Sequence, residues 1–289
     1  MSDTPSRTIP RPIKREVRQR CGFGCVLCGS AIYEYHHMVM WSEEHRHVAE
    51  EITLLCPSHH SEVTNGRLPA SRVLQADADP FNKRADLSPG YALHYAGSEA
   101  LVALGSNHFR APGGRDLTVV RVLGQTLLGM RFEDGNYLLN FVGYDKEGRV
   151  AVRIDDNELS FRADSWDIEF VGTTLVVRDG PGEVFLDMTF QPPDGIIVHR
   201  FFFHRNGIGV DVRDGVVNVA RGAIGLEGNF WDGATDGINL YETAMQKVAG
   251  FAISVDLSPD PRRTQPLPQY RPNTPGWLAT VPLPRWRGN

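Results

Sequence analysis

From about residue 117 to residue 255, the chain alternates short apolar runs with turn-forming residues. The runs are rich in Val, Ile, Leu and Phe, as in RVAVRI, WDIEFVG, TLVVR and IIVHRFFFH, and DG, EG, NG and PPDG stand between such runs. Runs of this composition between Gly and Asp turns are typical of β-strands. The pattern predicts a mainly β domain that is a sandwich, a barrel or a solenoid, and spacing alone does not choose among them.

The N-terminal part of the chain follows a different pattern. Pro12 is placed to start a short charged helix over residues 13–20. YEYHHMVMW and ITLLC predict two short strands around the polar loop SEEHRHVAEE, and Pro57 then opens a helix through SHHSEVTN that Gly66 ends. A further helix is expected over residues 70–77. The predicted order is strand, loop, strand, helix, so the whole chain is predicted to be α+β.

These patterns divide the chain into segments of different character. We expect a disordered basic arm at 1–12, a small domain at 13–78, a linker at 79–116, a β-rich domain at 117–257 and a Pro-rich basic tail at 258–289. The N-terminus has no apolar segment of the kind found in signal peptides, and no run is long enough to span a bilayer, so we expect a cytoplasmic protein.

Charge is unevenly distributed along the 289 residues, whose formal net charge is -5. Both ends are basic and the long middle is acidic. Basic side chains near the N-terminus are candidates to contact nucleic-acid phosphates, and they are Arg15, Arg18 and Arg20.

All four cysteines lie in the first fifth of the chain, which in a reducing compartment indicates a metal rather than disulfides. Cys25 and Cys28 form a C-x-x-C pair, and Cys56 and His59 form a C-x-x-H pair. Two such pairs supply the four ligands of a closed structural Zn²⁺ site. The alternative is a set of buried cysteines without metal. Cys21 has the wrong spacing for a ligand pair and is interpreted as a small core residue.

The remaining histidines of this segment predict a second site. His36 and His37 are adjacent on a predicted strand, so their side chains point in different directions. His59 and His60 are rotated by about 100° from each other on the helix. If His59 faces the zinc, His60 can face the strand that carries His36 and His37.

The sequences CVLCG, YEYHHM and ITLLCPSHH resemble the zinc-containing branch of the HNH family of ββα-metal nucleases, over about residues 13–78. The resemblance implies that His36 and His60 are ligands of a catalytic divalent cation, Mg²⁺ or another, and that His37 is the general base. It also implies a nucleic-acid substrate, with DNA favoured. A neutral imidazole can accept a proton from water, while a cation stabilises charge on the phosphate and the leaving oxygen.

Two positions depart from the family pattern. The central Asn of the family falls at Glu51 or Glu50 here, and Glu51 is a candidate to accept a backbone hydrogen bond or to orient His37. His45 and His47 in the same loop could assist. Thr64 stands where many relatives carry another histidine ligand.

We therefore expect a metal-dependent HNH endonuclease, with a catalytically inactive HNH-fold zinc module that binds nucleic acid or a protein partner as the alternative. The layout, a small HNH module joined to an unrelated domain, resembles that of bacterial restriction and antiphage-defence effectors and of mobile-element nucleases. The β-rich domain is expected to sense a protein or ligand trigger, to regulate the nuclease or to form a homo-oligomer.

Overall fold

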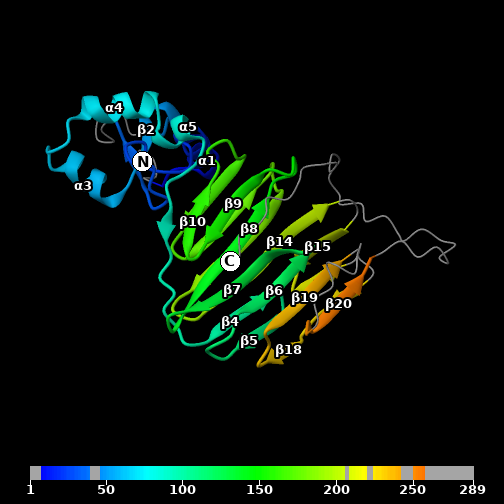
Figure 1. The fold of residues 1–289 in the computed structure, drawn as a ribbon. Helices are drawn as coiled ribbons and strands as arrows, with labels where there is room; N and C mark the ends of the chain where they lie inside the picture. The colour runs from blue at the N-terminus through cyan, green and yellow to red at the C-terminus, as the bar shows by residue number, and fades with distance from the viewer. Residues whose placement is uncertain (1–7, 40–45, 206–207, 220–223, 242–249, 258–289) are drawn as a thin grey trace, which may run out of the picture. The chain divides into compact units, whose positions relative to one another are not determined.

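The computed structural model describes residues 8–39, 46–205, 208–219, 224–241 and 250–257. Strand is the dominant element, and helices occur only near the N-terminus of the described part (Figure 1). Contacts divide the chain into two compact units. The first contains residues 1–91, 160–172 and 177–182, and the second contains 92–159, 173–176 and 183–289. None of the described helices is long and apolar enough to span a membrane.

The first unit has a short antiparallel hairpin surrounded by helices. Its elements are α1 (Arg11–Cys21), β1 (Glu34–His37), η1 (Ala49–Glu51), β2 (Ile52–Leu55), α3 (Pro57–Thr64), α4 (Ala70–Ala78), α5 (Phe81–Ala85) and β11 (Asp167–Val171). In the hairpin, His36 lies opposite Thr53 and His37 lies opposite Ile52. Each helix and strand that the sequence predicted between residues 13 and 77 is present, with ends shifted by a few residues.

Local sequence explains where these helices begin and end. Pro12 lies in the first turn of α1, where a missing N–H costs no helical hydrogen bond, and Gly22 closes the helix in the left-handed region with φ 70°. Val17 and Cys21 lie one turn apart on the face of α1 that enters the core, and both are fully buried. Cys21 is therefore the core residue that its spacing predicted, and burial raises the pKa of its thiol to about 11.

The apolar cluster around the cysteines of the first unit is small. Apart from the cysteines, its buried side chains are Ile9, Val17, Val26, Ala49, Ile52, Leu54, Leu55 and Val73. A core of this size gives little stability by itself, so a bound metal would contribute much of the folding free energy of the unit.

The remaining strands form two sheets. One sheet has the order β20-β19-β6-β7-β8-β9-β10-β3, and the other has the order β11-β12-β13-β14-β15-β16-β17, with β4 beside β14, β5 beside β4 and β18 beside β5. The bounds are β3 (Tyr91–Ala92), β4 (Ala100–Leu104), β5 (Asn107–Ala111), β6 (Leu117–Val122), β7 (Gln125–Glu133), β8 (Asn136–Tyr144), β9 (Val150–Asp155), β10 (Glu158–Phe161), β12 (Thr174–Arg178), β13 (Val184–Gln191), β14 (Gly195–Arg205), β15 (Ile208–Arg213), β16 (Val216–Val219), β17 (Ile224–Leu226), β18 (Phe230–Asp232), β19 (Asp236–Tyr241) and β20 (Ile253–Asp256).

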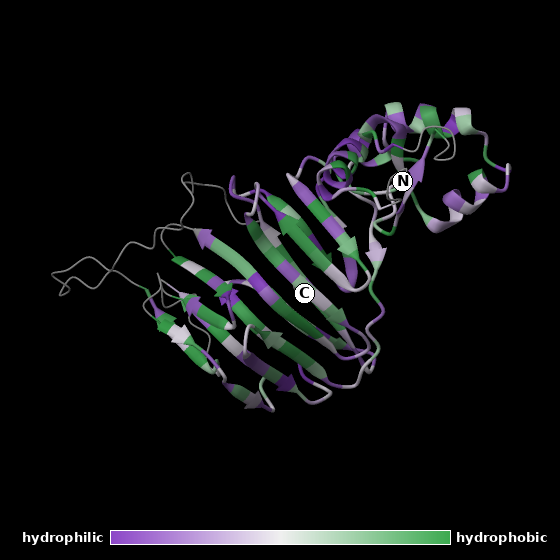
Figure 2. Ribbon diagram, turned by 180° about the vertical axis from the view of Figure 1, so that it is seen from behind, coloured by the Kyte–Doolittle hydropathy of each residue, from purple (hydrophilic) through white to green (hydrophobic). Residues whose placement is uncertain are grey.

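Side chains of the two sheets meet inside the second unit. Phe141 of β8 and Phe201 of β14 have ring centroids 5.4 Å apart, and Tyr144 and Phe203 on the same strands are 5.6 Å apart. Hydrophobic and hydrophilic residues alternate along many of these strands (Figure 2), as expected when one face is buried and the other is exposed. In the described part of the chain both sheets are open, so the structure is α+β with a mainly β second unit, as predicted, and the sheets do not close into a barrel.

The structure differs from the expected segments in two places. Residues 79–116, which we expected to be a linker, carry α5 and the strands β3, β4 and β5. Strand β4 pairs with β14 in parallel, a contact too distant in sequence to be seen in a local pattern. Residues 160–172 and 177–182, expected in the β-rich domain, belong to the first unit. The basic arm up to residue 7 and the tail 258–289 lie outside the described residues.

Candidate functional site

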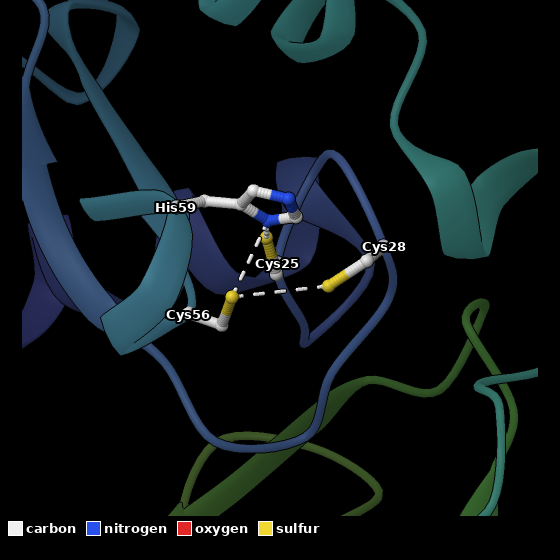
Figure 3. A group of neighbouring side chains, drawn as sticks. All are labelled: Cys25, Cys28, Cys56 and His59. Carbon is white, nitrogen blue, oxygen red and sulfur yellow. Dashed lines mark hydrogen bonds between the residues drawn. The ribbon is translucent and has the colours of Figure 1, made fainter. Parts of the chain in front are cut away.

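Three cysteines and one histidine gather in the first unit (Figure 3). Cys25 and Cys28 lie in the loop between α1 and β1, Cys56 follows β2, and His59 lies in the first turns of α3. Their ligand atoms are all within 4.8 Å of one another. The sequence predicted these four residues as one ligand set, and the structure brings them together in a cluster that could hold a zinc ion.

The distances within this cluster suit tetrahedral zinc. His59 Nδ1 lies 3.3 Å from the Sγ atoms of both Cys25 and Cys56, and the Sγ atoms of Cys28 and Cys56 are 3.9 Å apart. Two thiolates bound at about 2.3 Å in a tetrahedron are separated by roughly 3.8 Å. A hydrogen bond with Cys28 lowers the pKa of Cys25 to about 4, against the effect of burial, so Cys25 readily becomes the thiolate that zinc binds.

The loop that carries Cys25 and Cys28 is closed by Asn82 of α5. The Asn82 side chain is fully buried and donates Nδ2 to the carbonyl oxygens of Gly22 at 2.9 Å and Gly29 at 3.2 Å. Within the loop, the Gly29 N–H donates to Cys25 O at 2.7 Å. Sequence reasoning missed Asn82, because it lies in the segment expected to be a linker and has no spacing pattern relative to the cysteines.

A second cluster lies beside the first and contains His36, His60 and Glu34. The rings of His36 on β1 and His60 on α3 meet edge to face, with centroids 5.1 Å apart. Glu34 Oε2 forms a hydrogen bond with Nδ1 of His60, which leaves Nε2 of His60 as its other ligand atom. Burial, followed by His60 and His37, lowers the pKa of His36 to about 4, so its imidazole is neutral near pH 7.

Glu34 is a site residue that the sequence analysis missed. Its signal was present, because residues two apart on a strand share a face and Glu34 precedes His36 by two. A carboxylate hydrogen-bonded to the far nitrogen of a histidine is a common way for proteins to orient a metal ligand.

His37 contacts a third histidine, His47. His37 Nε2 and His47 Nδ1 are 3.2 Å apart. The carboxylate of Glu51 accepts a hydrogen bond from Arg46 at 2.7 Å, while its main-chain oxygen accepts the Met38 N–H at 2.8 Å. Burial and His47 lower the pKa of His37, and the charge of Glu51 partly opposes them. Glu51 therefore anchors the end of β1 through its backbone, and His47 orients the His37 ring.

The three arginines expected to contact phosphates have other partners. Arg18 is 4% exposed and its guanidinium is paired with buried Asp167, so we correct its expected role. Arg20 is half-buried and donates to Ala49 O at 3.0 Å, to Ile52 O at 2.5 Å and to the Asp77 carboxylate, so its guanidinium has partners within the first unit. The charged sequence of α1 predicts that Arg18 and Arg20 are exposed to solvent. In the structure, other segments of the first unit also contact the polar side of this helix.

Arg15 differs from these two arginines. Its guanidinium lies over the Trp166 ring at 4.9 Å, and the side chain is half-buried. In contrast to Arg18, it keeps part of its surface exposed.

Comparisons of the chain with known protein families, curated proteins and solved structures give no match.

Proposed function

We propose that this chain is a metal-dependent endonuclease of the HNH type that hydrolyses phosphodiester bonds of nucleic acid, DNA in the first instance. The observation that carries the proposal is the pairing of His36 with His60 directly beside the Cys25, Cys28, Cys56 and His59 cluster. A zinc scaffold needs only the cluster of three cysteines and His59. Three further histidines, His36, His37 and His60, gathered on the hairpin and the helix have no role in holding such a scaffold.

The residues of the second cluster fit a divalent cation. His36 and His60 would hold it, with Glu34 fixing the orientation of His60. Two imidazoles favour Mn²⁺, Co²⁺, Ni²⁺ or Zn²⁺, and Mg²⁺ would depend more on water and phosphate oxygens. The cation, when bound, supplies electrostatic stabilisation of the phosphate and of the departing oxygen.

In this proposal His37 takes the proton from the attacking water. Its Nε2 faces His47 Nδ1, so a hydrogen bond donated from Nε2 makes Nδ1 of His37 the basic nitrogen. The lowered pKa of His37 keeps the ring neutral, and therefore able to accept a proton, at pH 7.

The alternative is a catalytically inactive HNH-fold zinc module that binds nucleic acid or a protein partner. One observation favours it. Glu51 stands where the family has Asn, and a carboxylate near the proposed phosphate position would repel the phosphate. The 2.7 Å ion pair with Arg46 opposes this repulsion.

For the β-rich unit we propose a regulatory role, by sensing a trigger or by building an oligomer. Residues 160–172 and 177–182 of this region of the sequence are part of the first unit, which supports such a role. We propose a place in bacterial defence or restriction because the proposal combines a nuclease with a regulatory domain.

The deciding experiment is incubation of the full-length, zinc-loaded chain with plasmid DNA, single-stranded DNA and RNA in Mg²⁺, Mn²⁺, Co²⁺ or Ni²⁺. We expect His37→Ala to abolish cleavage without changing the zinc content. The matched control is His108→Ala, which removes an exposed histidine on β5. If the wild-type chain binds nucleic acid but cuts none of these substrates with any ion, the inactive-module alternative is correct.

A further inference from the structure

A buried ionic network joins α1 to β11 within the first unit. Arg18 donates Nε to Asp167 Oδ1 at 2.9 Å and Nη2 to Oδ2 at 2.8 Å, a bidentate pair. Arg18 is 4% exposed and Asp167 is 1% exposed. Burial is the largest single influence and lowers the pKa of Arg18, but the hydrogen bond with Asp167 and the charges of Tyr35, Tyr33 and Asp167 together outweigh it, so the pKa is raised and the guanidinium stays charged. Charges this deeply buried are maintained only by well-formed geometry.

The network continues along the first unit to β12. Arg178 Nη1 lies 3.0 Å from Asp167 Oδ2 and 3.3 Å from Glu169 Oε2, and Glu169 Oε1 lies 3.4 Å from Arg18 Nη1. Two arginines and two carboxylates thus balance in charge. Arg178 contacts the same Asp167 oxygen, Oδ2, as Arg18 does, so both arginines hold this carboxylate.

Neighbouring contacts hold the same segment against the N-terminal helices. Gln19 Nε2 of α1 donates to Trp166 O at 2.6 Å, and Lys83 Nζ of α5 donates to Ala163 O at 2.9 Å. Asp167 therefore sits in a segment that is fixed at several points, which makes it a firm support for Arg18.

Arg18 also reaches the strand that carries the candidate ion ligands. Its Nη1 donates to the Tyr35 hydroxyl at 3.0 Å, and that hydroxyl lies 3.4 Å from Lys14 O, to which it donates. Tyr35 lies on β1 between Glu34 and His36. Because side chains alternate along a strand, Tyr35 is on the face opposite to Glu34 and His36, so Arg18 holds the strand from behind.

Strand β1 needs such a support. In the described part of the chain it pairs with β2 alone, and an isolated two-stranded hairpin is only marginally stable in water. A bound ion requires its ligands to be held within about 0.5 Å of the productive geometry. His36 on this hairpin and His60 on α3 meet that requirement only if β1 is fixed.

We propose that Asp167, acting through Arg18 and Tyr35, is a positioning residue for the His36 and His60 ion site. The inference rests on the proposed function of that site. An apolar pair of similar volume would join α1 to β11 as firmly as the ion pair does, but it could not hold the Tyr35 hydroxyl. Positioning and simple stabilisation can therefore be separated.

The test uses the full-length, zinc-loaded chain with ¹³C-labelled histidine. Tyr35→Phe removes only the hydroxyl, and the double variant Arg18→Met with Asp167→Leu replaces the ion pair by an apolar one. We expect both to keep the zinc content and to melt near the wild-type temperature. Mn²⁺ affinity measured by calorimetry should fall by about tenfold, and the imidazole resonances of His36 and His60 should shift.

The matched control is Asp164→Asn, which changes a carboxylate of the same segment that is paired with Arg162 on the surface. It should leave Mn²⁺ affinity and imidazole resonances unchanged. The proposal is overturned if the double variant melts near the wild-type temperature and also has wild-type Mn²⁺ affinity and wild-type imidazole resonances. Asp167 is then only a stabilising residue.

Failure of the proposed function gives a different result. If the wild-type chain cuts no nucleic acid while the variants still lose Mn²⁺ affinity, the positioning role stands and the nuclease proposal fails. If the wild-type chain binds no Mn²⁺, there is no ion site for Asp167 to position, and the positioning role is overturned.

Discussion

His59 and His60 are consecutive residues of α3, and their side chains belong to different clusters. His59 Nδ1 lies 3.3 Å from two cysteine sulfurs, whereas Nδ1 of His60 is hydrogen-bonded to Glu34 on β1. The helical rotation of about 100° per residue produces this division. One turn of helix thus contributes one residue to the cluster that could hold zinc and the next residue to the candidate catalytic cluster.

The two histidines should therefore give opposite results when replaced. His59→Ala removes one of four zinc ligands and should forfeit a large part of the roughly 10–16 kcal/mol that structural zinc contributes in small zinc domains. His60→Ala should keep the zinc and the melting temperature while lowering affinity for the second ion and abolishing cleavage. Zinc content by mass spectrometry and calorimetric melting check both. Equal zinc loss in the two variants would show that the clusters are not separate.

Removal of zinc should unfold the first unit selectively. All the described helices belong to this unit, so the helical circular dichroism signal reports on it. We expect a strong chelator to abolish that signal while the strand signal persists, and re-addition of Zn²⁺ to restore it. A helical signal that survives complete zinc removal would contradict the prediction.

Acid should have the same effect as the chelator. The hydrogen bond with Cys28 lowers the pKa of Cys25, so its thiolate contributes stability that is present above pH 9.0 and is lost as the pH falls through the lowered pKa. Protons also compete with zinc for its ligands, so zinc content and helical signal should fall together on acidification. A helical signal that persists after acid has released the zinc would contradict this prediction.

Local spacing made part of the site predictable. Cys25 with Cys28, and Cys56 with His59, are short-range pairs whose chemistry can be recognised without knowledge of the fold. Alternation on a strand and rotation on a helix then placed His36 and His60 on facing elements. The strands of the second unit could be recognised individually, since each has its own apolar run bounded by turn residues.

Long-range partners could not be predicted in this way. Arg18 and Asp167 are 149 residues apart, and nothing in either local sequence indicates the other. Arg18 was assigned to phosphates because an exposed and a buried arginine look alike in sequence. Parallel pairings such as β6 with β19 are equally hidden, because no turn connects the two strands.

Glu34 should control the ion site through His60. Glu34→Ala removes the hydrogen bond to Nδ1 of His60, and loss of such an orienting carboxylate typically lowers metal affinity by about 10–100-fold. Glu34→Gln keeps a hydrogen-bonding group and should have a smaller effect. Mn²⁺ titration calorimetry measures both, with Glu50→Gln, an exposed neighbour on η1, as the control. Unchanged Mn²⁺ affinity in Glu34→Ala would remove Glu34 from the site.

Gly29 should be indispensable to the zinc loop for a reason that Gly66 does not share. Both have φ in the left-handed region, at 76° and 70°. A Cβ on Gly29 would lie 2.3 Å from Asn82 Oδ1 and 2.6 Å from Pro89 Cδ, whereas a Cβ on Gly66 would have nothing within 4 Å. Gly66→Ala should therefore cost only the backbone penalty of roughly 1–2 kcal/mol.

Gly29→Ala carries the same backbone penalty and also displaces Asn82, the residue that closes the loop around Cys25 and Cys28. We expect a clearly larger loss of stability and a lowered zinc content, while Gly66→Ala retains all of its zinc. Denaturant unfolding and zinc analysis of the two variants side by side measure the difference. Equal losses of stability with full zinc in both would mean that the contact between Asn82 and the loop is not what holds the metal cluster together.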